Sequence, residues 1–146
     1  MKKIVSIFAI VLMTAATLNQ AAYAVDYDTP ADEVLIDEYV AFATLSANLN
    51  INGDTASYLS SAKVTSLGTI TVTHSLEKYS GWFWSWDTVS GSTDSKTKSN
   101  TSMISLSSSK SGLSNGKYRV KSVFAVTTNT GVTETVTIYS SEKTIS

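Results

Sequence analysis

Alternation of apolar and polar residues is the feature that most constrains the fold of this chain. From Tyr118 the even positions are Tyr118, Val120, Ser122, Phe124 and Val126, and the interleaved set begins with Lys117, Arg119 and Lys121. Successive side chains of a β-strand point to opposite faces of the sheet. This stretch therefore predicts a central strand with one apolar face and one face that begins basic and is solvated.

The same period of two recurs along most of the chain and predicts an all-β fold. It is clearest at 41–51, where it ends at Asn52-Gly53, a pair typical of a tight hairpin turn. We expect further strands at 55–64, 69–78, 82–89, 103–106 and 132–139, with polar loops at 91–100 and 107–115. About seven short strands without a long helical pattern predict an antiparallel β-sandwich.

The first 24 residues predict a secretory signal peptide. Lys2 and Lys3 precede an apolar run at 4–13 that is too short to span a bilayer, and Ala22-Tyr23-Ala24 matches a cleavage site. We expect cleavage after Ala24, secretion and no stable membrane anchor in the mature form; an uncleaved anchor is the alternative. The predicted organisation is a signal peptide at 1–24, an acidic and loosely ordered leader at 25–38, and a β-sandwich domain at 39–146.

Composition and charge indicate how the fold is stabilised and which partners are disfavoured. The chain has no cysteine, so its stability must come from a hydrophobic core rather than from disulfides. After removal of Lys2 and Lys3, nine basic side chains remain against twelve acidic ones, a balance that does not favour nucleic acid as a partner.

A short motif resembles the tyrosine corner of immunoglobulin and fibronectin type III sandwiches. Leu113, Gly116, Tyr118 and Val120 stand in its order. The resemblance implies an immunoglobulin-like, disulfide-free sandwich in which the Tyr118 hydroxyl bonds back to nearby backbone. The order of strands and of the Gly116–Lys121 motif is also similar to an uncharacterised family of small secreted proteins of Gram-positive bacteria. That family has no assigned activity, so it implies fold and address only.

Three tryptophans in the run 81–86 form the candidate ligand-binding site. In a strand, Trp82, Trp84 and Trp86 would project to one face, with neighbours about 7 Å apart, which is twice the rise per residue. Such a strip can stack on sugar rings or on apolar protein surfaces. We predict a partly exposed aromatic strip here, and burial of all three rings in the core is the alternative.

Two polar residues interrupt apolar faces. His74, the only histidine, shares parity with Ile70, Val72 and Leu76, which predicts an inward, hydrogen-bonded and structural side chain. Glu134 shares the parity of the apolar residues around it. Because an unpaired buried carboxylate is costly, we expect it at the sheet end, bonded to backbone or beside a cation. No pattern of catalytic, metal-ligating or cofactor-binding residues is present.

These features predict a secreted, non-catalytic β-sandwich that binds a glycan, a cell-wall component or a protein, at the bacterial surface or in the medium. One alternative is a structural module that self-associates through the tryptophan strip. Another is a small secreted hydrolase or inhibitor that uses His74 with Asp87 or Glu134. The sequence leaves the oligomeric state open.

Overall fold

The computed structural model describes residues 23–30, 34–35 and 41–146, the first two ranges as backbone alone. Most of the predicted signal peptide, and residues 31–33 and 36–38 of the predicted acidic leader, lie outside the described residues, so both stay predictions. β1 (Tyr23–Pro30) runs parallel to β8, and β2 (Val34–Leu35) is antiparallel to β3. The described residues include no helix able to cross a membrane.

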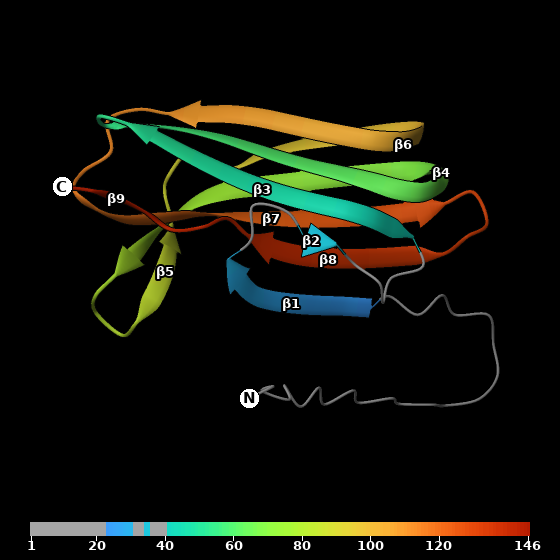
Figure 1. Cartoon of the computed structure of the whole chain (residues 1–146), viewed down its shortest axis with the longest axis horizontal. Coiled ribbons are helices and arrows are strands. Elements are labelled where there is room, and N and C mark those ends of the chain that lie inside the picture. The colour runs from blue at the N-terminus through green and yellow to red at the C-terminus, as the bar shows by residue number, and fades with distance from the viewer. Residues whose placement is uncertain (1–22, 31–33, 36–40) are drawn as a thin grey trace.

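From residue 41 onward, seven strands form one antiparallel sheet that curls strongly into a half-barrel (Figure 1). The neighbour order is β8-β7-β4-β3, while β5 and β6 pair with β4 and β9 pairs with β7. The all-β, antiparallel prediction is therefore confirmed. The strands are β3 (Phe42–Asn52), β4 (Thr55–Ser80), β5 (Ser85–Thr88), β6 (Asp94–Lys110), β7 (Gly116–Thr128), β8 (Thr133–Tyr139) and β9 (Lys143–Ile145).

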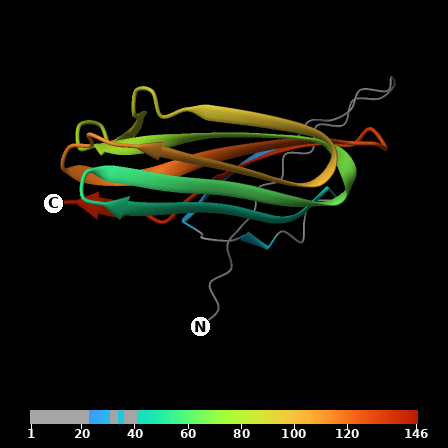
Figure 2. The ribbon, with the colours of Figure 1, turned by 90° about the horizontal axis from the view of Figure 1, so that it is seen from above.

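β4 is the strand around which the sheet curls. Its first half pairs with β3 and its second half with β7, so β3 lies opposite β7 and β8 across the core. β6 follows β4, and both strands double back at the same end of the molecule (Figure 2). The bend in β4 contains Gly68, where an added Cβ would lie 2.5 Å from the Thr127 carbonyl oxygen. Only glycine allows β4 and β7 to approach this closely.

Several element boundaries differ from the predicted ones. The strands expected at 55–64 and 69–78 are one continuous strand, β4, and the short β9 was not predicted. The polar stretch at 91–100, expected to be a loop, belongs largely to β6, which also contains the strand expected at 103–106. Of the loop expected at 107–115, the first four residues belong to β6 and residues 111–115 lie outside any strand. β6 pairs with β4 alone and most of its side chains are exposed. Ile104 and Leu106 pack into the core, but the first half of the strand presents no apolar face. Its hydroxyls instead bond across the strands, as in Thr71 to Thr97 at 2.8 Å.

A polar layer divides the core into two apolar clusters. Ser60, His74 and Ser122 are fully buried, and each occupies the inward position between a residue of one cluster and a residue of the other. The larger cluster lies toward the bend of β4 and the smaller one toward the end of the molecule where β9 lies. The larger side chains of the first are Phe42, Leu45, Ile70, Phe124 and Ile138, and those of the second are Leu49, Tyr58, Leu76, Leu113 and Tyr118.

Candidate functional site

The predicted tryptophan strand is a hairpin turn. β4 continues to Ser80 and β5 begins at Ser85, so the run 81–84 forms the loop between them. The φ angles of Phe83 and Trp84 are 70° and 57°, in the left-handed region. The chain therefore reverses about three residues later than the sequence suggested. The prediction of three indoles along one strand face is wrong, because only Trp86 lies in a strand.

The side chains of this loop are the most exposed large apolar groups in the described part of the chain. The exposed fractions are 76% for Trp82, 84% for Phe83 and 86% for Trp84. The rings of Trp82 and Phe83 meet edge to face with centroids 5.9 Å apart. The hairpin projects from the half-barrel at the end where β9 lies (Figure 1). We call Trp82, Phe83 and Trp84 the aromatic tip.

The base of the hairpin is held by a stack on the outer face of the sheet. The guanidinium carbon of Arg119 lies 4.3 Å from the ring centroid of Trp86 and 3.9 Å from that of Tyr139. Its Nε donates to Glu77 Oε2 at 2.8 Å. The Tyr79 ring also contacts Trp86, with ring centroids 5.3 Å apart. Trp86 is therefore a structural residue of the hairpin base and is only partly exposed.

The basic face of β7 is less solvated than the sequence suggested. The Arg119 side chain is only 13% exposed, and Lys117 lies over the Tyr79 ring and pairs with Glu142. No local sequence pattern indicates this packing, because Tyr139 and Glu77 lie far from Arg119 along the chain. That Glu77 stands opposite Arg119 becomes evident only once the register of β4 and β7 is known.

His74 lies at the centre of a hydrogen-bonded chain that begins in the core and ends at the surface. Ser60 Oγ is 2.8 Å from His74 Nδ1 and 2.7 Å from Ser122 Oγ, and His74 Nε2 is 2.8 Å from Ser108 Oγ. Ser108 in turn donates to Asp94 at 2.5 Å. With the Ser108 proton directed to Asp94, Nε2 of a neutral His74 donates to Ser108, and Nδ1 accepts from Ser60.

This environment favours the uncharged form of His74. Burial lowers the pKa of His74, and the opposing attraction of Asp94 is the smaller effect. The Tyr58 ring covers the imidazole at 4.7 Å between centroids, and burial, followed by the Asp94 charge, raises the pKa of the Tyr58 hydroxyl. The prediction of an inward, hydrogen-bonded histidine is confirmed.

His74 does not form the pair with Asp87 or Glu134 that the hydrolase alternative names. His74 is 1% exposed, and its ring nitrogens bond to Ser60 and Ser108 rather than to Asp87 or Glu134. Glu134 is buried on the core side of β8 and accepts from the Ala41 backbone N–H at 3.1 Å. A backbone partner for Glu134 was one of the three arrangements expected, and this prediction is confirmed.

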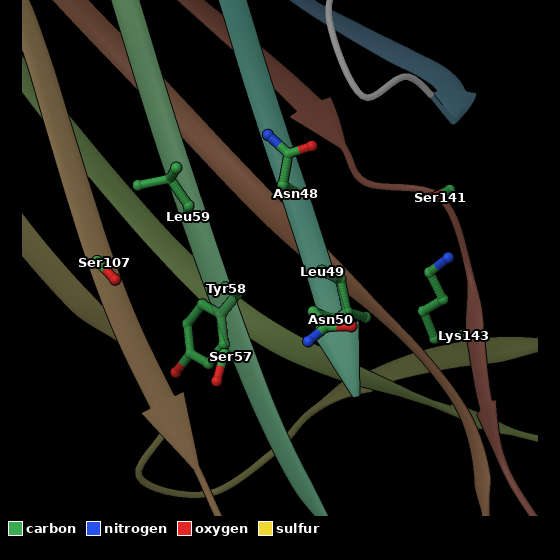
Figure 3. Close-up of a pocket in the computed structure, with 9 residues that line it drawn as sticks. All are labelled: Asn48, Leu49, Asn50, Ser57, Tyr58, Leu59, Ser107, Ser141 and Lys143. Atoms are coloured by element: carbon green, nitrogen blue, oxygen red, sulfur yellow. The ribbon is translucent and has the colours of Figure 1, made fainter. Parts of the chain in front are cut away.

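A shallow hollow that does not include the tip is lined by residues of β3, β4 and β6 and by Ser141 and Lys143 (Figure 3). Its volume is about 360 Å³, and its walls combine polar and apolar groups. The residues that line it include Asn48, Asn50, Ser57, Ser107 and Lys143, with Leu59 as an exposed apolar member. A second, smaller hollow is lined by residues of β3, β4 and β6. The aromatic tip takes part in neither hollow.

Within the described residues, no group of three or more His, Cys, Asp and Glu side chains converges as a metal site would require. The candidate site is therefore the aromatic tip and the stacked base beneath it. Neither the models of protein families nor the curated proteins include a match to this chain.

Proposed function

We propose that this protein is a secreted, non-catalytic binding module and that the aromatic tip is its contact surface. The exposure of Trp82, Phe83 and Trp84 carries the proposal. Large exposed aromatic patches are uncommon on soluble proteins and usually mark a contact with something outside the chain. The predicted signal peptide supports an extracellular site of action, and the ligands expected from the sequence are a glycan, a cell-wall component or a protein.

The backbone of the tip supports the same conclusion. Two successive left-handed residues in a hairpin are normally Asn and Gly, because a Cβ in this conformation costs about 1–2 kcal/mol per residue. Phe83 and Trp84 occupy these positions. Neither side chain recovers that cost through burial in the fold. Strained residues of this kind gather at functional sites.

We propose further that the half-barrel belongs to the immunoglobulin-like sandwiches. The hydroxyl of Tyr118 donates to the Ser114 carbonyl at 2.6 Å, which is the local bond that the tyrosine-corner resemblance implies. The packing of β3 against β7 and β8 across a common core is also in keeping with two facing sheets.

The test replaces the tip by the turn sequence that its backbone prefers. In the double variant Phe83→Asn/Trp84→Gly, we expect unchanged or higher stability, by about 1–2 kcal/mol, and loss of binding to bacterial surfaces and cell-wall preparations. Leu67→Ser removes an exposed apolar side chain near the bend of β4, far along the strand from the tip, and serves as the matched control.

Binding by the double variant that equals wild-type binding would refute the proposal. Trp emission and acrylamide quenching of the wild type check that Trp82 and Trp84 are exposed in solution. A measurement of molecular size distinguishes the alternative of self-association. A dimer that the double variant dissociates would identify the tip as a homotypic interface.

A further inference from the structure

We propose that the ligand of the aromatic tip is the interfacial region of a lipid bilayer, which the protein contacts peripherally and reversibly. This inference rests on the proposed binding function of the tip and names the class of ligand. It follows from the shape of the tip, from the chemistry of its side chains and from the balance of charge behind it.

The tip is convex, whereas sites for small molecules and sugars are concave. Such sites surround the ligand with apolar walls and a few converging polar groups. Both hollows described above lie elsewhere on the domain. The backbone turns at Phe83 and Trp84, so the three rings do not share one flat face on which a glycan chain could lie.

The side chains of the tip match the boundary between lipid and water. Tryptophan is enriched at this boundary, because its large apolar body can enter the acyl region while its N–H stays hydrated. A projecting loop of three aromatic side chains can reach the depth of about 5–10 Å at which peripheral proteins bury their apolar groups. Apart from the two indole N–H groups, these side chains offer no hydrogen-bonding group to a protein partner.

Charge at this end of the domain is largely balanced within the protein. Arg119 pairs with Glu77, and Lys117 pairs with Glu142. Lys78 stands opposite Asp87 in the β4–β5 ladder, and its ammonium donates to Ser114 Oγ at 2.6 Å. Attraction to anionic lipid is therefore not expected to dominate, and the aromatic side chains supply most of the affinity.

The stack on Arg119 gives the tip a fixed direction. Trp86, the second residue of β5, is held against the sheet by Arg119, and the loop at 81–84 points away from the half-barrel. A loop that is already ordered loses less conformational entropy when it enters an interface.

The experiment uses the chain from Val25 onward, because the apolar run at 4–13 would itself partition into lipid. The probes are large unilamellar vesicles of phosphatidylcholine, with and without phosphatidylglycerol. We expect wild-type protein to cofloat with both kinds of vesicle and its Trp emission to shift to the blue. We expect Trp84→Ala to weaken the partition about tenfold. Leu67→Ser is expected to bind as the wild type does.

The outcomes separate this inference from the proposed function. If wild-type protein binds neither kind of vesicle, but Trp84→Ala weakens binding to cell-wall preparations or glycans, the bilayer inference is wrong and the binding function stands. If Trp84→Ala alters binding to no surface, both are wrong. Binding only to the vesicles that contain phosphatidylglycerol would also overturn the inference if salt abolishes that binding. Lysines rather than the aromatic tip would then supply the affinity.

Discussion

Replacement of Arg119 by alanine tests whether the stack anchors the hairpin that bears the aromatic tip. The substitution removes a cation that lies between the rings of Trp86 and Tyr139 and that bonds to Glu77 at 2.8 Å. It also leaves the Glu77 carboxylate, which is 8% exposed, without this partner. The expected result is a less stable domain with a loosened β4–β5 hairpin.

The magnitude follows from the burial of the ion pair. Removal of one partner from a fully buried pair costs about 3–5 kcal/mol, and each cation–π contact contributes about 0.5–1 kcal/mol at a partly exposed site. The pair lies on the outer face and keeps some contact with solvent, and these contributions are not additive. We therefore expect Arg119→Ala to lower the free energy of unfolding by about 3 kcal/mol, or Tm by roughly 10 °C.

The assay is a double-mutant cycle on Arg119 and Glu77, measured by urea unfolding. We expect a coupling energy of about 1–2 kcal/mol between Arg119→Ala and Glu77→Ala. Arg119→Lys, which keeps the charge but not the planar stack, should recover only part of the loss. With Trp82 and Trp84 replaced by Phe, Trp86 is the single reporter, and its emission should shift to the red in Arg119→Ala.

A coupling energy below about 0.5 kcal/mol, together with unchanged Trp86 emission, would refute this reasoning. The ion pair would then contribute no more than an exposed pair does. The direction of the hairpin would have to come from the β4–β5 ladder alone.

Three further predictions concern the fold. Gly68→Ala, whose Cβ would meet backbone, should destabilise by about 2–3 kcal/mol, whereas Gly81→Ala, which meets nothing, should change Tm little; equal effects would contradict the close approach at the bend. Because burial lowers the pKa of folded His74 below its ordinary 6.5, the unfolded chain binds a proton more tightly. The free energy of unfolding should therefore fall as pH drops below about 6.5, by up to about 1.4 kcal/mol per pH unit. Urea unfolding measured at several pH values should show a weaker dependence of this free energy on pH in His74→Gln than in the wild type. Tyr118→Phe leaves the Ser114 carbonyl without the hydroxyl that donates to it and should cost about 1–2 kcal/mol by urea unfolding; an unchanged midpoint would mean that this bond is not part of the fold's stability.

The apolar faces of the strands could be read from the sequence, because burial imposes a period of two. The predicted strands at 41–51, 118–126 and 132–139 correspond closely to β3, β7 and β8. Only residues 103–106 of β6 were predicted as a strand, because the first half of β6 is exposed and carries no such period. The strand geometry there comes from backbone pairing with β4. The continuity of β4 was not predicted either: the strands expected at 55–64 and 69–78 left a gap that contains Gly68, and in the structure Gly68 permits a bend within one strand.

The polar layer could have been found from the same pattern. Ser60, His74 and Ser122 each interrupt an apolar run, and their convergence needs only the register between strands. Among the described residues, no buried side-chain polar atom lacks a partner, so the layer is fully satisfied. A slip of β4 against β7 would leave these groups facing apolar side chains. The layer therefore favours one register over its neighbours.

The aromatic residues of the β4–β5 hairpin fall into two groups with different roles. Trp86 and Tyr79 pack on the sheet through Arg119 and Lys117, and their loss should cost stability. The aromatic tip gives almost nothing to the core and adds two left-handed residues, so its loss should cost no stability at all. A segment that opposes folding and exposes apolar surface is the observation on which the proposed contact outside the folded chain rests. A comparison of the unfolding and binding of Trp86→Ala and Trp84→Ala therefore separates the two roles: Trp86→Ala is expected to be the less stable, and Trp84→Ala to be as stable as the wild type but deficient in binding.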